Sequence, residues 1–253
     1  HMIILGLIVL ISPLLFIPFI SKGNGELTKY FRIDVRYQKL TKEYSQQNSS
    51  TYLADFQGKN LSGAVLGGTV LNKSNLRFTN LSNAYIGLAN LNYSDLGSAN
   101  LQNTQLIRSN LKGALLDRAR LITANFRFAC LDSANFSSAI AYAADFTNAE
   151  ANYAIFDHVH FVRTEFIMSQ LRGSHFYDAD LQYSIFNSAN LQGSVFWGSN
   201  LKGVNFEGAI LDSVDFTSAD ITEAILANAS LKDVKGIELD QFSKVKTLFG
   251  VKN

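Results

Sequence analysis

The sequence has few of the residues that cross-link or interrupt a globular chain. Its 253 residues include one cysteine, Cys130, so no internal disulfide can form. Only two prolines occur, Pro13 and Pro18, and none follows residue 20. Because proline lacks a backbone N–H, a long stretch without it suits a stack of strands in which every donor is needed.

Strong net charge and catalytic signatures are also missing. The formal net charge is +1, which argues against direct binding of nucleic acid. The chain has no phosphate-binding loop and no dinucleotide-binding glycine pattern. The repeat described below places no base beside Cys130, so nothing would activate its thiol as a nucleophile. The sequence therefore predicts neither an enzyme nor a bound cofactor.

Charge is absent from residues 3–20, which are almost wholly apolar. About 20 apolar residues can cross the ~30 Å hydrocarbon layer of a bilayer, so this segment predicts a transmembrane helix. A targeting segment and a packed cap helix are the alternatives. No basic residue precedes the run and no small-residue cleavage site follows it, which disfavours a signal peptide.

Residues 21–53 read as a polar linker or N-terminal cap. They carry six basic residues and three acidic ones, a net charge of +3. Since positive flanks stay on the cytoplasmic side of a membrane, the sequence predicts a membrane-anchored protein whose remaining chain is cytoplasmic. The alternative is a solvated linker whose charges have no topological meaning.

Residues 54–233 repeat with a period of five. Of the 36 positions that end in 1 or 6, from Phe56 to Leu231, 34 are Leu, Phe or Ile, and the exceptions are Ala141 and Ala151. Two residues before these central positions, 35 of 36 residues are Ala, Ser, Thr or Val. No insertion interrupts the register.

An odd period excludes a continuous strand, because side chains alternate between the two faces with a period of two. The chain must therefore turn once in every unit, and repeated turning builds a solenoid. From residue 126 to residue 216 every second centre is Phe, which favours an even number of sides and hence four units per coil. The predicted core ladder comprises Phe126, Phe136, Phe146, Phe156, Phe166, Phe176, Phe186, Phe196, Phe206 and Phe216.

Units such as Ala99-Asn100-Leu101 and Ala179-Asp180-Leu181 resemble the A-(D/N)-L-x-x signature of the pentapeptide-repeat family. Asn or Asp precedes the centre in 17 of 36 units. The resemblance implies an all-β solenoid, a right-handed quadrilateral β-helix, here of about nine coils. At ~4.8 Å per coil the predicted rod is about 43 Å long.

Residues 234–253 are predicted to form a C-terminal cap. Within them, apolar residues in 237–249 follow a helical spacing, and an open solenoid end needs covering. The family resemblance also implies, as a secondary expectation, a homodimer through this end.

The sequence predicts no metal site. The candidate ligands, were a metal bound, would be His158 and His160 with Asp178 and Asp180, which stack one coil later. The alternative is a set of His–Asp contacts between coils. A candidate interaction surface on one side comprises Ile155, Tyr177, Val195 and Trp197, since outward positions are expected to be polar. Its alternative is packing between coils.

Charge is uneven along the repeat. Residues 54–128, the basic half, hold eight basic and three acidic residues, a net +5. Residues 129–233, the acidic half, hold four basic and 13 acidic residues, a net −9.

Three functions remain open. The first is a non-enzymatic, membrane-anchored scaffold that binds a protein partner. The second, implied by the family resemblance, is a DNA mimic that binds DNA gyrase or topoisomerase, with which the acidic half is compatible. The third is a lumenal or periplasmic repeat protein released from a targeting segment.

Overall fold

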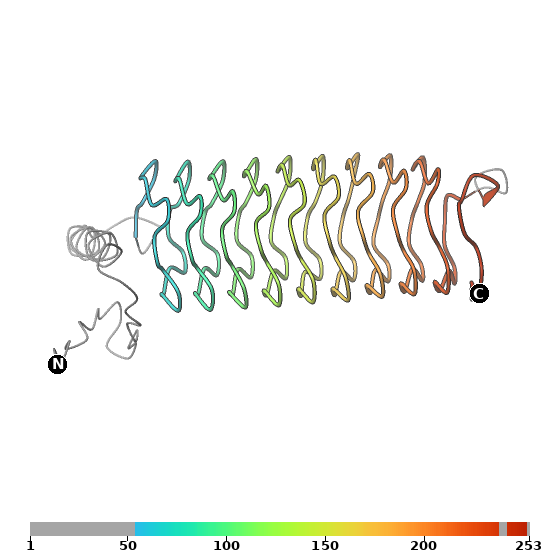
Figure 1. Cartoon of the computed structure of the whole chain (residues 1–253), viewed down its shortest axis with the longest axis horizontal. Coiled ribbons are helices and arrows are strands. Elements are labelled where there is room, and N and C mark those ends of the chain that lie inside the picture. Colours follow the sequence, from blue (N-terminus) through green and yellow to red (C-terminus); the bar gives the residue numbers. More distant parts are fainter. Residues whose placement is uncertain (1–53, 238–241, 252–253) are drawn as a thin grey trace, which may run out of the picture.

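The computed structural model describes residues 54–237 and 242–251, which form one elongated stack of coils (Figure 1). Parallel bridges join every fifth residue to the residue 20 positions later, from Asp55 at the start to Lys235 at the end. Each strand is therefore a single paired residue between two turns. The 20-residue circuit agrees with the four-sided coil that the sequence predicts, and the fold is a repeat β-solenoid.

We number the four sides by their central residues. In the first coil the centre of side 1 is Phe56, of side 2 Leu61, of side 3 Leu66 and of side 4 Leu71, and each later coil adds 20. Side 1 is thus opposite side 3, and side 2 is opposite side 4. In every unit the centre is buried, and so is the residue two places before it in all units after the first two, where Ala54 is half-buried and Lys59 is exposed; most of the other three residues are not buried.

Backbone hydrogen bonds between successive coils, together with one that closes the turn, explain the stability of the five-residue period. In the first unit, the N–H of Phe56 donates to the carbonyl of Asn75 at 2.7 Å, and the N–H of Asn75 donates to Ala54 at 2.8 Å. The N–H of Gly58 also donates into the next coil, at 2.9 Å, and the N–H of Lys59 closes the turn on Phe56. Only the residue directly after the centre has no backbone acceptor for its N–H in this pattern.

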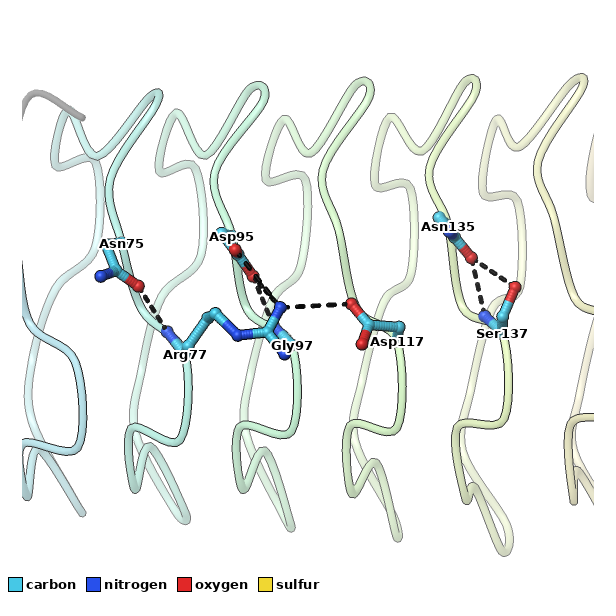
Figure 2. A network of polar contacts seen from close by, with 7 residues as sticks. All are labelled: Asn75, Arg77, Asp95, Gly97, Asp117, Asn135 and Ser137. Carbon is cyan, nitrogen blue, oxygen red and sulfur yellow. Dashed lines mark hydrogen bonds and ion pairs between the residues drawn. The ribbon is translucent and has the colours of Figure 1, made fainter. Parts of the chain in front are cut away.

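Asn or Asp before the centre satisfies that remaining N–H. In all 17 units with Asn or Asp there, its Oδ1 accepts a hydrogen bond from the N–H two residues later, at 2.8–3.5 Å. Figure 2 shows three of these bonds, from Arg77 to Asn75, from Gly97 to Asp95 and from Ser137 to Asn135. This local Asx geometry gives the Asn/Asp preference of the repeat a physical cause.

Every unit ends in left-handed backbone. All 36 residues two places after a centre, from Gly58 to Asp233, have φ between +48° and +70°, and 27 of them are not glycine. A positive φ at the third residue of a hydrogen-bonded turn is the type II geometry. Left-handed backbone costs a non-glycine residue about 1–2 kcal/mol, so the ladder bonds and the core must offset this cost at most corners.

Two phenylalanine ladders fill the core from residue 126 to residue 216. On side 3, ring centroids of successive coils lie 4.6–5.3 Å apart with planes within 27° of parallel. On side 1 the spacing is 4.6–5.4 Å and the planes lie within 9°. Rings of opposite ladders meet edge to face, for example Phe166 and Phe176 at 88°. All ten rings are buried.

Phe161 fills the space beside Ala141. Both are centres of side 2, one coil apart, and both are fully buried. The ring of Phe161 contacts Phe136 and Phe146, which belong to the coil of Ala141, at centroid distances of 6.3 and 5.8 Å. The larger ring thus compensates for the small neighbour.

Small polar residues lie buried two places before the centre, where most of their hydroxyls donate to backbone carbonyls; Ser74 and Ser194 are the exceptions among the described residues. Thr79 Oγ1 donates to the carbonyl of Phe56 in the preceding coil at 2.8 Å. Ser169 Oγ instead donates to Phe166 in its own turn at 2.7 Å. Because such a hydroxyl is hydrogen-bonded, Ser and Thr can replace Ala at this buried position.

The C-terminal segment differs from the sequence prediction. From residue 243 to residue 251 the chain runs through turns and one extended bridge, so the predicted helix over 237–249 is wrong there. Thr247 pairs with Ile225, which is 22 residues earlier rather than 20. The N–H of Leu226 donates to the carbonyl of Thr247 at 2.9 Å.

The physical reason lies in the backbone of the last coil. Its N–H and carbonyl groups need partners, and a helix cannot supply them because it uses its own backbone groups internally. An extended segment can pair with them, while Phe242, Val245 and Val251 pack against the core. The end is therefore covered, as expected, but by a further strand-like segment (Figure 1).

The predicted transmembrane helix at 3–20 and the linker at 21–53 lie outside the described residues. In the described ranges, no helix has the length and apolar character needed to cross a bilayer.

Candidate interaction surfaces

An aromatic cluster lies on side 1 in the acidic half. The rings of Tyr177 and Trp197 meet edge to face with centroids 5.6 Å apart. In the neighbouring column, bridges place His175 between Ile155 and Val195. We call these five residues the aromatic patch. Trp197 keeps 45% of its surface exposed, whereas the other three apolar members are half-buried.

Neighbouring side chains position the patch and give it an acidic border. The backbone N–H of Tyr177 donates to Asp157 Oδ1 at 3.0 Å, so a carboxylate lies directly beneath the ring-bearing residue. At the adjoining corner, Gly198 has φ of +70° and lies against the Asp178 carboxylate, which a Cβ would clash with. Glycine at this corner therefore lets Asp178 lie beside Trp197.

His158, His160, Asp178 and Asp180 do not gather into one site. His158 Nδ1 lies 3.9 Å from Asp178 Oδ2 at a corner of side 1. His160 and Asp180 pair as bridge residues on side 2. Within the described ranges, no three of these side chains lie close enough to hold an ion. Their arrangement is that of contacts between successive coils.

Another group of potential metal ligands lies on side 4. Cys130, Asp132 and Glu150 have ligand atoms within 4.8 Å of one another, and they are the only such group among the described residues. Asp132 Oδ1 already accepts from the backbone N–H and side-chain amide of Asn152, at 3.0 and 3.1 Å. Burial raises the pKa of the Cys130 thiol, and both nearby carboxylates raise it further. The thiol therefore stays protonated at neutral pH, and we assign this group no function.

An ion-pair network occupies side 1 of the basic half (Figure 2). Arg77 Nη1 lies 3.2 Å from Asp95 Oδ1 and 3.7 Å from Asp117 Oδ1. Asp95 is buried, and it also accepts the N–H of Gly97 at 3.0 Å. The guanidinium lies where a Cβ on Gly97 would be. These charges are therefore committed to holding three coils together.

The sequence indicated the aromatic patch through its four apolar members but missed His175. Histidine is an ordinary outward residue, so only its column marks it: it lies 20 residues from both Ile155 and Val195. The group on side 4 was missed because its members differ in position within the unit.

The geometry defines a four-sided parallel solenoid with a repeating Asx hydrogen bond. A family model, "Pentapeptide repeats", matches residues 53–86, 99–137, 142–176, 160–198 and 199–235. The chain belongs to the pentapeptide repeat family.

Several solved structures are similar in architecture. HetL, a pentapeptide repeat protein involved in heterocyst differentiation regulation in the cyanobacterium Nostoc, is 20% identical, with 92% of this chain and 95% of that chain covered and a TM-score of 0.44. Full-length QnrB1, a plasmid-mediated fluoroquinolone resistance protein, is 18% identical over 78% of this chain and 90% of its own, with a TM-score of 0.43. A thylakoid-lumen protein of Arabidopsis thaliana is 25% identical over 42% and 56%, with a TM-score of 0.22. No curated protein matches the chain significantly.

Proposed function

We propose that this chain is a non-enzymatic scaffold that holds a protein partner through the aromatic patch. The observation that carries the proposal is the exposed indole of Trp197 beside Tyr177, on a wall held by ladder bonds in every coil. Exposed aromatic residues surrounded by apolar neighbours are typical of the strongest contacts in protein interfaces. A rigid wall also keeps the entropic cost of binding low.

The border of the patch indicates the chemistry of the partner. Asp157 and Asp178 lie beside the rings, in a half of the rod with a net charge of −9. A lysine or arginine of the partner would contact an aromatic face and a carboxylate together, while its apolar neighbours cover Ile155 and Val195. The partner segment is therefore expected to combine basic and apolar side chains.

We also propose that residues 3–20 anchor the scaffold in a membrane, with the repeat on the cytoplasmic side. The uncharged length of this segment and the basic flank in 21–53 support the proposal. Alkaline extraction of host membranes tests it: an anchored chain stays in the pellet, and recovery in the supernatant would reject the anchor. Protease added to sealed vesicles would report the side on which the repeat lies.

Capture from detergent-solubilised host membranes tests the scaffold. The tagged full-length chain is compared with the double variant Tyr177→Ala/Trp197→Ala and with Leu115→Ala. Leu115 is 41% exposed on the same side but in the basic half, so it serves as a matched control. We expect a partner that the wild type and Leu115→Ala retain and the double variant loses. A partner retained equally by all three would reject the patch as its binding site.

A DNA-mimicking role is the second candidate, favoured by the 13 acidic residues of the acidic half. Rows of carboxylates at regular spacing could compete with DNA phosphates for a basic surface on gyrase or topoisomerase. The net charge of +5 in the basic half opposes such binding over the rest of the rod. A supercoiling assay with a large excess of the protein decides the matter, since unchanged gyrase activity would exclude the mimic.

A further inference from the structure

The acidic residues of the basic half all lie on one side of the rod. Asp55, Asp95 and Asp117 belong to units of side 1, whereas the units of the other three sides hold no Asp or Glu before Asp132. Two of these acids face Arg77, at 3.2 and 3.7 Å. Sides 2, 3 and 4 of the basic half thus carry positive charge only.

Sides 3 and 4 also carry most of the exposed apolar surface of the basic half. Eight large hydrophobic residues are exposed between residues 54 and 128, and six of them belong to units of these two sides. The six are Val65, Val70, Tyr85, Leu88, Tyr93 and Phe128. The other two, Phe78 and Leu115, belong to units of side 1. Exposed apolar side chains gathered in this way indicate an interaction site.

Apolar and basic side chains alternate along the corner between sides 3 and 4. Leu88, Arg108 and Phe128 follow one another at steps of 20 residues, which is one coil or about 4.8 Å. Leu88 and Phe128 are 64% and 46% exposed. Arg108 Cζ lies 5.5 Å from the ring centroid of Phe128, and Arg127 Cζ lies 5.9 Å from it. We call this corner, together with Lys112 on side 4, the basic edge.

Two bases of the basic edge can contact an anion outside the rod. Among the residues that the structure describes, no carboxylate pairs with Arg108 or Lys112, and both side chains are exposed. Arg127 lies 3.8 Å from Asp145, which partly neutralises it. A convex corner does not enclose a small ligand, but it can lie on a flat anionic surface. There the basic groups contact phosphates, and the apolar side chains enter between the headgroups.

We propose that the basic edge lies on the anionic surface of a lipid bilayer, while the acidic half of the rod points away from it. Anionic lipids attract each nearby base, and the attraction falls off within a Debye length of about 8 Å. Leu88 and Phe128 add an apolar contact that binding to nucleic acid phosphates would leave unused. This contact is separate from the anchor proposed for residues 3–20 and does not require it.

The charge of the acidic half determines the tilt. Beyond residue 128, the units of sides 3 and 4 hold seven acidic residues and two basic ones. An anionic surface therefore repels the continuation of the same corner, and the rod should stand at an angle with its basic half against the bilayer. Because the aromatic patch lies on side 1 of the acidic half, opposite side 3, it stays accessible to a protein partner.

Fluorescence from single labelled cysteines in the full-length chain tests the contact. In a Cys130→Ser background, Leu88→Cys and Phe78→Cys are each labelled with nitrobenzoxadiazole, whose emission rises in an apolar environment. Phe78 is the matched control, because it is 56% exposed at the opposite corner of the same coil. The chain is reconstituted into phosphatidylcholine vesicles with or without about 30% phosphatidylserine.

We expect phosphatidylserine to raise the emission at Leu88 about twofold and to leave that at Phe78 unchanged. The rise should fall by about half between about 50 mM and 500 mM salt, because salt screens the attraction. Met168→Cys tests the tilt: it is 56% exposed on the same corner but four coils later, and its label should not respond.

Charge reversals test which bases are responsible. Arg108→Glu/Lys112→Glu should remove most of the response at Leu88, because it places two carboxylates against the lipid phosphates. Arg118→Glu/Arg120→Glu makes the same change in net charge on sides 1 and 2, and it should leave the response unchanged. An equal loss from both double variants would show that net charge alone attracts the rod, and it would overturn the assignment to this edge.

Flotation with neutral vesicles separates the edge contact from the anchor. A chain that floats with both kinds of vesicle, but whose labels at Leu88 and Phe78 behave alike, is anchored without an edge contact, which overturns the proposal. A chain that floats only with anionic vesicles and responds at Leu88 lacks the anchor but supports the edge contact. An equal response at Leu88 and Met168 overturns the tilt. A Leu88 label that responds to duplex DNA and not to vesicles would assign the edge to nucleic acid instead.

Discussion

The basic and acidic halves share one backbone but differ in their cores. Between Leu61 and Leu121 the centres are Leu or Ile, whereas from Phe126 to Phe216 every second centre is Phe. The ladder bonds between coils and the corners with positive φ recur in both halves. The bridges between coils therefore do not depend on which large apolar side chain fills the centre.

The two halves also differ in how core packing is combined with surface charge. The acidic half combines stacked aromatic rings with a net charge of −9, and the basic half combines aliphatic packing with a net charge of +5. Like charges repel most in the acidic half, where aromatic pairs contribute about 0.5–1.5 kcal/mol beyond burial alone. The stronger core thus lies under the more strongly charged wall.

The largest expected effect removes a ring from a ladder. Phe176→Ala breaks parallel stacking at 4.8 and 4.6 Å to the rings of Phe156 and Phe196 and leaves a cavity, so it should lower the unfolding free energy by about 4 kcal/mol. Leu96→Ala, a centre of the same side in the basic half, should cost about 3 kcal/mol. Urea denaturation measures both. A greater cost for Leu96→Ala would show that the ladder adds nothing to burial.

A corner substitution should affect both halves equally. A Cβ on Gly113 or Gly203 would lie 2.6 Å from the ring of Tyr93 or Tyr183, respectively, and both glycines have φ near +65°. We expect Gly113→Ala and Gly203→Ala each to cost about 2–3 kcal/mol, from strain and loss of ring packing. Gly193→Ala is the control, since it meets nothing within 4 Å and should cost about 1 kcal/mol from backbone strain alone. Equal costs at all three sites would mean that the tyrosine rings move aside freely.

Ion pairs should contribute more in the basic half. Arg77→Ala leaves the buried Asp95 carboxylate without its nearest cation, and we expect a loss of about 2 kcal/mol in unfolding free energy. Lys202→Ala removes an exposed pair at 3.9 Å to Glu223 in the acidic half and should cost less than about 0.5 kcal/mol. The melting temperatures of the two variants at low and high salt distinguish the contributions of the two ion pairs. A similar salt dependence for both would show that Asp95 is as well hydrated as Glu223.

Acid should destabilise the C-terminal coils slightly. Hydrogen bonds from Thr217 lower the pKa of Asp215, and those from Thr222 lower the pKa of Asp220. Because the folded pKa values lie below the unfolded ones, their stabilisation is present above about pH 4 and is lost as pH falls through the folded values. Asp215→Asn/Asp220→Asn, which keeps the acceptor oxygen, should flatten the pH dependence of the urea midpoint. An unchanged pH profile in this variant would assign the acid sensitivity to other groups.

Much of the fold could be predicted because one short period determines it. The regular positions of Leu and Phe give the units, and their alternation gives the number of sides. The corners were less accessible, since residues such as Phe78 and Thr123 seldom adopt a positive φ elsewhere, and only the ladder holds them there. The right-handed winding and the number of coils stay predictions.

The candidate surfaces were predictable only in part. A fixed repeat assigns each outward residue to a side, and Tyr177 and Trp197 could therefore be placed together from their numbers alone. The His158 group failed as a cluster because a corner lies between His158 and His160, which a linear reading does not show. At the C-terminus, the apolar spacing of 237–249 is compatible with a helix, but pairing with the last coil takes precedence.

The 20-residue bridges have a consequence for how the chain folds. However long the rod, paired residues are separated by the same short distance in sequence, so the cost of closing each loop does not grow along the chain. Folding can then start in any one coil and extend by adding neighbours, as in other linear repeats. We expect the aromatic coils around Phe166 to be the most favourable starting point. The rod would then lengthen in both directions. At the C-terminal end, the pairing of Thr247 with Ile225 would end its growth.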